Sequence, residues 1–282
     1  MKEIFFALGL KPRPKEYSFE IDSFNLPREG EILFARWQHP REKKKEFTQA
    51  AVNELRRFLR EGETAIDIGA HTGDTALPMA LAAGPKGIVF ALEPNPYVFK
   101  TLLANAALNR KKTNIFPLMF AATPEDGEFD FEYSDSGFCN GGLHQDISEW
   151  QHGHFFKLCV KGKNLVHYLK AEFPEASNRI RFVKIDTEGY DRTVAASLKD
   201  LLIQNRPFIK SEIYQHLSSD ARAGYLGDLQ AMGYKVHKFN GDEDYAGIEL
   251  GADDMMKWKH YDIFAVPEER AQAVLANRQP GA

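Results

Sequence analysis

A chain of 282 residues with 43% hydrophobic and 27% charged residues has the size and composition of a globular domain with one large core. Its formal net charge of −4 provides no general attraction to nucleic acid or to an anionic membrane surface, so we expect neither as a partner. Because no apolar run approaches the roughly 20 residues of a spanning helix, no signal-peptide pattern is visible and the two cysteines have no redox or metal-binding spacing, we expect a cytoplasmic protein.

Residues 1–46 are expected to form an N-terminal extension or cap outside the main domain. They contain four prolines and short alternating stretches, such as 17–21, that are typical of a hairpin. A run of charged residues follows, in which basic and acidic side chains alternate: Arg41, Glu42, Lys43, Lys44, Lys45 and Glu46. A solvated surface run is the favoured interpretation of this segment, and a patch for an anionic ligand is the alternative.

The main domain is expected over residues 47–270, with a C-terminal tail at 271–282. Short apolar runs alternate with helix-patterned segments, which predicts an α/β fold with a doubly wound, mostly parallel sheet of seven strands. The predicted strands are 64–69, 87–93, 114–121, 181–186, 207–213, 234–239 and 262–267. The predicted helices are 47–60, 74–83, 96–108, 165–173, 193–204 and 219–232.

The least regular stretch lies at 123–154, where five glycines separate polar and aromatic residues. We interpret it as a strand pair plus a loop. A lid over a binding site and a plain surface excursion are both compatible with a loop of this length.

A glycine turn connects the first predicted strand of the sheet to a helix. Gly69 and Gly73 let the backbone turn tightly beside a ligand, and free N–H groups at the helix start favour a carboxylate. Glu93 ends the next strand, where its carboxylate can accept hydrogen bonds from both hydroxyls of a ribose. The spacing is G-x-x-x-G, whereas a pyrophosphate-binding turn has G-x-G-x-x-G. The motif therefore favours S-adenosylmethionine (SAM) over NAD.

Acidic residues also end the fourth and fifth strands of the predicted sheet. Asp186 and Glu188 follow the fourth strand, and Glu212 and His216 lie at or just past the end of the fifth. Ligands bind beyond the carboxyl ends of such strands, so we expect these side chains to converge on one pocket. Asp186 is the first candidate for a general base or for orienting the methyl acceptor, and Glu188 and His216 are further catalytic candidates.

Two alternatives for these residues stay open. In the first, Glu188 caps the following helix and Asp186 pairs with Lys184. In the second, Asp186 and Glu212 hold Mg²⁺, because oxygen-rich carboxylate sites suit hard divalent ions. Carboxylate clusters at strand ends also occur without metal, so a metal-free site is the first expectation.

Three motifs together resemble the FkbM family of SAM-dependent methyltransferases. They are DIGAHTGDT at 67–75, EPNP at 93–96 and KIDTEG at 184–189, and the last is the most specific. The resemblance covers about residues 47 to 240. It implies a class I methyltransferase fold and, most often, O-methylation of a hydroxyl on a sugar or a secondary metabolite. The oligomeric state is not indicated.

The resemblance also implies which residues hold SAM. They lie around the glycine turn and at the end of the second strand: Asp67, Gly69, Ala70, His71, Gly73, Thr75, Glu93, Pro94 and Asn95. His71 stands where the family usually has Asn, which leaves a side-chain contact to SAM at this position open. An NAD-dependent oxidoreductase is the second hypothesis, disfavoured by the glycine spacing. A catalytically silent SAM-binding module is the third, disfavoured by the acidic residues at three successive strand ends.

Overall fold

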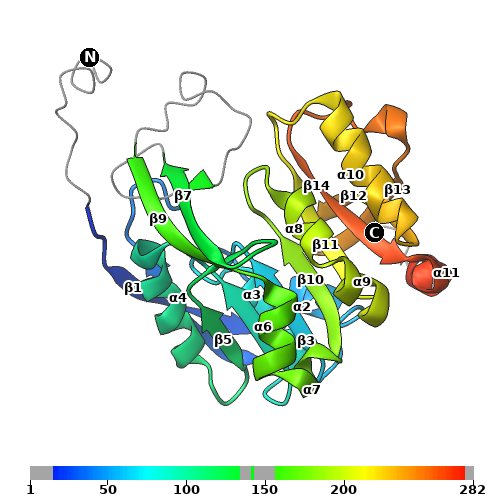
Figure 1. Cartoon of the computed structure of the whole chain (residues 1–282). Coiled ribbons are helices and arrows are strands. Elements are labelled where there is room, and N and C mark those ends of the chain that lie inside the picture. The colour runs from blue at the N-terminus through cyan, green and yellow to red at the C-terminus, as the bar shows by residue number, and fades with distance from the viewer. Residues whose placement is uncertain (1–14, 134–140, 143–155, 277–282) are drawn as a thin grey trace, which may run out of the picture.

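The central element of the fold is an eight-stranded sheet, seen in a computed structural model that describes residues 15–133, 141–142 and 156–276 (Figure 1). Its strands are β3 (Thr64–Ile68), β4 (Ile88–Leu92), β5 (Ile115–Leu118), β10 (Ile180–Ile185), β11 (Phe208–Ile213), β12 (Tyr234–Gly241), β13 (Asp244–Glu249) and β14 (Tyr261–Pro267). Their order is β13-β12-β14-β11-β10-β3-β4-β5. The five strands from β11 to β5 pair in parallel, and the other three pair antiparallel.

This arrangement confirms the doubly wound, mostly parallel α/β fold. All seven predicted strands are present, with ends within a few residues of those expected. The eighth strand, β13, was not predicted and lies at the sheet edge, where it pairs only with β12 among the described strands. Half of its residues are exposed, so its sequence lacks the apolar run that marks the central strands.

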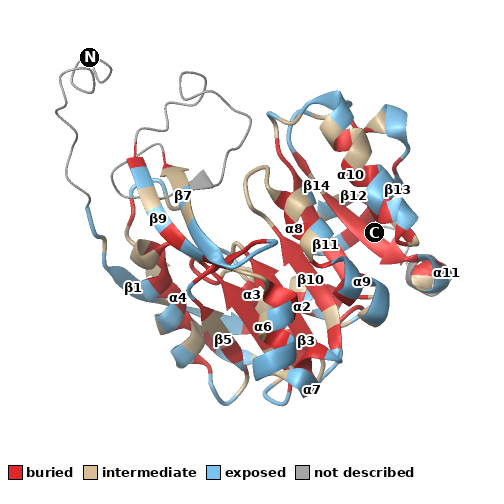
Figure 2. Ribbon diagram, in the orientation of Figure 1, coloured by how far each residue is buried: buried red, intermediate tan, exposed pale blue. Residues whose placement is uncertain are grey.

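Helices cover both faces of the sheet. They are α2 (Gln49–Leu55), α3 (Ala76–Ala83), α4 (Pro96–Leu108), α6 (Leu165–Glu172), α7 (Pro174–Ser177), α8 (Asp191–Ser197), α9 (Lys199–Asn205), α10 (Ser219–Ala231) and α11 (Glu268–Ala276). One core cluster joins the sheet to α6, α8, α9 and α10, and a second joins its other face to α2, α3, α4 and α11. The central strands β3, β4, β10, β11 and β14 between them are almost entirely buried (Figure 2).

The helix expected at 193–204 needs correction, because it is broken into α8 and α9 at Leu198. The domain boundary expected after residue 270 lies within α11 and stays a prediction. No helix in the described part of the chain is long and apolar enough to cross a membrane.

A second, smaller sheet follows β5. Its strands are β6 (Ala121–Ala122), β7 (Gly127–Tyr133), β8 (Gly141–Gly142) and β9 (Phe156–Lys163), in the order β6-β9-β7-β8. The antiparallel pair of β7 and β9 is the strand pair expected near 123–154, although β9 begins two residues after that stretch. The loop predicted there lies largely outside the described residues.

The expected N-terminal hairpin is present, and a buried amide of α4 is among the groups that fix it to the domain. Strands β1 (Phe19–Leu26) and β2 (Gly30–Trp37) pair antiparallel and lie beside α4 (Figure 1). The buried Asn105 side chain accepts a hydrogen bond from Ala35 N at 2.6 Å and donates to Ala35 O at 2.9 Å. It also donates to Thr72 O in the glycine turn at 2.7 Å. The amide therefore holds the hairpin, α4 and the turn in one arrangement.

Replacing Asn105 with Ala should destabilise the protein, because it leaves one buried donor and two buried acceptors without partners. We expect the free energy of unfolding to fall by at least about 2 kcal/mol in a denaturant titration, since each unsatisfied buried group costs roughly 1–3 kcal/mol. Leu103→Ala, at an exposed position of the same helix, is the matched control. Equal losses in the two variants would show that Asn105 does not hold the hairpin.

Candidate functional site

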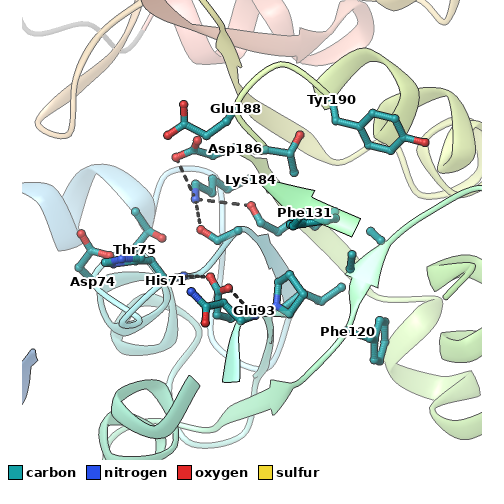
Figure 3. Close-up of a pocket in the computed structure, with 18 of the residues that line it drawn as sticks. His71, Asp74, Thr75, Glu93, Phe120, Phe131, Lys184, Asp186, Glu188 and Tyr190 are labelled. Carbon is teal, nitrogen blue, oxygen red and sulfur yellow. Dashed lines mark hydrogen bonds and ion pairs between the residues drawn. The ribbon is translucent and has the colours of Figure 1, made fainter. Parts of the chain in front are cut away.

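A cavity of about 330 Å³ lies at the carboxyl ends of β3, β4 and β10 (Figure 3). In the sheet, β3 has β4 on one side and β10 on the other, so the chain reverses its direction of winding there. Open α/β sheets bind ligands at this switch point. The predicted site residues that line the cavity are Gly69, His71, Thr75, Glu93, Pro94, Asn95, Asp186 and Glu188.

Asp67, Ala70 and Gly73 are not among the lining residues, and they shape the glycine turn instead. Asp67 is fully buried, and its carboxylate accepts a hydrogen bond from Thr75 Oγ1 at 2.6 Å. Gly69 has a φ of 76°, and a Cβ atom there would overlap the carbonyl oxygen of Asp186. Gly73, with a φ of 92°, lies where a Cβ would press against α4. The glycines are therefore needed for close backbone packing.

The Glu93 carboxylate is fixed at the cavity wall by two backbone groups. Its oxygens accept hydrogen bonds from His71 N and from Asn95 N, each at 2.9 Å. Asn95 in turn caps α4 by accepting from Tyr97 N at 3.0 Å. The side chain is only 7% exposed, and this burial raises the pKa of Glu93 to about 7. Each carboxylate oxygen keeps a lone pair with which it can accept a hydrogen bond from one of two neighbouring hydroxyls.

A buried lysine ties the ends of β3 and β10 together. The Lys184 ammonium donates to Gly69 O at 2.8 Å and lies 3.3 Å from Asp67 Oδ1 and 3.2 Å from Asp186 Oδ2. Burial alone would lower the pKa of Lys184, but the two carboxylates more than offset this, and the net pKa lies above its usual value. The ammonium therefore stays charged. The Asp186–Lys184 part of the alternative interpretation is confirmed.

Glu188 is the second cavity carboxylate with a raised pKa. Burial, followed by repulsion from Asp186, raises the pKa of Glu188 to about 7. Among the described residues it takes part in no ion pair, and it lines the cavity beside Asp186 (Figure 3). The alternative in which Glu188 caps the next helix is wrong. The N-cap residue of α8 is Tyr190, and no side chain forms a capping hydrogen bond there.

Asp191, rather than Glu188, holds the loop between β10 and α8. Its carboxylate accepts hydrogen bonds from Thr187 Oγ1 at 3.1 Å and from Gly189 N at 3.2 Å. Glu188 lies between these two donors and has a φ of 55°, a backbone conformation that is unusual for a residue with a side chain. The loop therefore presents Glu188 to the cavity through a fixed backbone.

The structure leaves Glu212 and His216 outside the cavity, contrary to the expected convergence. Buried Glu212 lies with Oε1 3.1 Å from His260 Nε2, and exposed His216 packs its ring against Tyr214 at 5.3 Å. Both come from β11 and its following loop, one strand farther from the switch point than β10. No three His, Cys, Asp or Glu side chains of the described residues are grouped as metal ligands, so the Mg²⁺ hypothesis on Asp186 and Glu212 gains no support.

Sequence reasoning missed the contribution of the charged segment 41–45. Arg41, Glu42, Lys43 and Lys45 line the cavity, although Arg41 and Lys43 are also exposed, so a solvated surface run describes only part of this segment. Lys45 Nζ lies 2.8 Å from Asp74 Oδ2 and 3.0 Å from Glu42 Oε1. The charge pattern could not reveal this, because Asp74 is distant in sequence and its approach depends on the hairpin.

The side of the cavity beyond Glu93 is apolar. Aliphatic and aromatic side chains come from the end of β4, from the chain around β6 and from β7: Leu92, Phe120, Ala121, Ala122, Phe131 and Tyr133. Such a wall can cover a flat ring that presents few polar atoms. These positions belong to no motif. Apart from Leu92, which ends β4, only their place after β5 would have indicated them.

Comparison with known proteins identifies a family and a related protein. The model of the methyltransferase FkbM domain matches residues 67–236. The hexuronic acid methyltransferase AglP of Haloferax volcanii is 26% identical over 197 residues, which cover 70% of this chain and 74% of that protein.

Solved structures of lower similarity include the SAM-bound fibrillarin of Aeropyrum pernix. It has 12% identity and a TM-score of 0.44, with 89% of this chain and 98% of that chain covered. A SAM-dependent O-methyltransferase of Thermotoga maritima has 14% identity and a TM-score of 0.41, with 88% and 77% covered.

Lys184→Met should destabilise the protein strongly, because the Asp67 carboxylate would stay buried without its cation. Breaking a buried pair by removing one partner costs about 3–5 kcal/mol, and we expect that loss in a denaturant titration. Asp67→Asn in the same background should recover part of it. Lys44→Met, at an exposed lysine outside the cavity, is the control. A loss as small as that of the control would mean that Lys184 does not hold the two strand ends.

Proposed function

The chain belongs to the FkbM methyltransferase family, and from this premise we propose that it transfers a methyl group from SAM to a hydroxyl oxygen of a sugar. The observation that carries the proposal is the cavity at the switch point, with the fixed carboxylate of Glu93 in one wall and Glu188 in another. The Haloferax volcanii relative, named for hexuronic acid, supports a sugar as the acceptor.

The residues present fit SAM. Glu93 would hold the ribose diol, since its carboxylate is fixed by two N–H groups and still has lone pairs at the cavity surface. The apolar wall beyond it would cover the adenine. The glycine turn and the start of α3 would receive the methionine carboxylate, because backbone N–H groups at a helix start favour an anion. When bound, SAM supplies a methyl group made electrophilic by its sulfonium.

Glu188 is our proposed general base. As the acceptor oxygen forms its bond to the methyl carbon and the carbon–sulfur bond breaks, the hydroxyl proton must pass to a base. A carboxylate whose pKa lies near 7 suits this role near neutral pH. Asp186 was the first candidate by sequence, but its carboxylate is engaged by Lys184 at 3.2 Å. We therefore propose that Asp186 orients the acceptor, and we assign His216 no catalytic role.

The overall proposal is tested by measuring the S-adenosylhomocysteine released when SAM and sugar acceptors are incubated with the protein. We expect release that depends on the acceptor hydroxyl, and calorimetry should show binding of SAM but not of NAD. Binding of NAD in preference to SAM would support an oxidoreductase. Binding of SAM without transfer to any hydroxyl would support a silent SAM-binding module.

Glu188→Gln should remove the base while keeping the shape of the side chain. We expect kcat to fall by about 10²–10⁴-fold, the usual loss for a general base. The dissociation constant of S-adenosylhomocysteine should change by less than about threefold, because the lost interaction acts in the transition state. In the wild type, kcat at saturating SAM should rise with pH through about 7, where Glu188 loses its proton, and this rise should be absent in the variant.

Asp186→Asn provides the comparison for Glu188→Gln. It should keep the rise of activity with pH but move it to lower pH, because the charge of Asp186 contributes to the raised pKa of Glu188. If the rise disappears in Asp186→Asn and persists in Glu188→Gln, Asp186 is the base.

Glu93→Gln should weaken SAM binding and change its dependence on pH. A ribose diol that donates to the carboxylate favours its ionised form, so wild-type affinity should fall as the pH drops below the pKa of about 7. We expect a loss of up to about tenfold between about pH 8 and about pH 6, since the ionised fraction of a group with a pKa of about 7 falls about tenfold over this interval. Titration calorimetry should find a flatter profile in Glu93→Gln, and an unchanged profile would remove Glu93 from the ribose site.

A further inference from the structure

We propose that Lys43 binds the carboxylate of the acceptor at the mouth of the cavity, so that the enzyme methylates an acidic sugar in preference to a neutral one. The proposal rests on the proposed function, because it names the class of sugar that the same site would accept. It concerns a part of the chain that precedes residue 67, where the match to the family domain begins.

The segment that carries Lys43 is held against the cavity on both sides. Before it, Trp37 at the end of β2 packs edge-on against His71 of the glycine turn, with ring centroids 5.7 Å apart. After it, Lys45 pairs with Asp74 at 2.8 Å and with Glu42 at 3.0 Å. Lys43 therefore projects from an anchored stretch of backbone rather than from a free loop.

The three lysines that line the cavity differ in their ion pairs. The ammonium of Lys184 is engaged by Asp67 and Asp186, and that of Lys45 by Asp74 and Glu42. Lys43 also lines the cavity, is exposed to solvent and forms no ion pair with any described residue. Its positive charge is consequently available to an anion that enters the cavity.

The size of the cavity indicates where the acceptor would lie. A volume of about 330 Å³ is near the lower end of the range for sites of drug-sized ligands, so SAM would fill most of it. The glycine turn would provide the partners of the methionine carboxylate, as proposed above. The acceptor would then lie at the mouth, where Arg41 and Lys43 are exposed. The Haloferax volcanii relative, named for an acidic sugar, agrees with a carboxylate at this place.

The test compares para-nitrophenyl β-D-glucuronide with para-nitrophenyl β-D-glucoside, which differ in the carboxylate. Their binding to the protein saturated with S-adenosylhomocysteine would be measured by calorimetry for the wild type, Lys43→Gln and Lys44→Gln. Lys44 is a matched control, because it is an exposed neighbour that does not line the cavity. We expect the wild type and Lys44→Gln to prefer the glucuronide by about fivefold, the effect of one exposed ion pair. Lys43→Gln should bind the two glycosides equally.

Three results would overturn the inference. Equal binding of the two glycosides by the wild type, or a preference that survives in Lys43→Gln, would show that Lys43 does not bind an acceptor carboxylate, while methyl transfer to sugars would stand. Weaker binding of S-adenosylhomocysteine by Lys43→Gln but not by Lys44→Gln would assign the lysine to the cofactor. Failure of the wild type to bind either glycoside, with S-adenosylhomocysteine bound, would overturn the sugar acceptor itself.

Discussion

The rest of the site depends on the interactions of the buried Lys184 ammonium. A charge in the interior is tolerated only when it is paired, and Lys184 has partners on both strands at the switch point: Asp67 and the Gly69 carbonyl from the β3 side, and Asp186 from the β10 side. The pairing fixes how the glycine turn and the loop after β10 face each other. The cavity between them is therefore a consequence of one ion-pair network.

The same network explains why two other carboxylates keep raised pKa values. The charge of Lys184 is shared by the nearest acids, Asp67 and Asp186, so it offsets little of the cost of burying Glu93 and Glu188. The pKa of each rises to about 7. Their surroundings nevertheless differ. Glu93 is held by two backbone N–H groups, which suits the binding role that we propose for it. Glu188 forms no ion pair with any described residue, which suits the proposed general base.

The sequence predicts the features that depend on neighbouring residues, and it does not predict those that depend on residues distant in the chain. The seven predicted strands carry buried apolar residues, whether they pair in parallel or antiparallel, and this pattern is visible in the sequence. The Asn95 cap with Pro96 marks the start of α4 at the expected residue. The exposed edge strand β13 lacks the apolar run of the central strands. The placement of segment 41–45 depends on Asn105 and Asp74, which are distant in sequence, and that of His216 depends on which strand lies next to β10. Contacts of this kind are set by topology.

The cavity combines a side built from the family motifs, which we propose for SAM, with a rim built from the N-terminal segment. Lys45 links the two, because its partner Asp74 lies directly after Gly73 and before α3. A change at Lys43 would leave this link intact, whereas a change at Lys45 would disturb the turn that faces the cofactor. Acceptor preference could thus vary along segment 41–45 without loss of cofactor binding, provided that Lys45 and Asp74 stay paired.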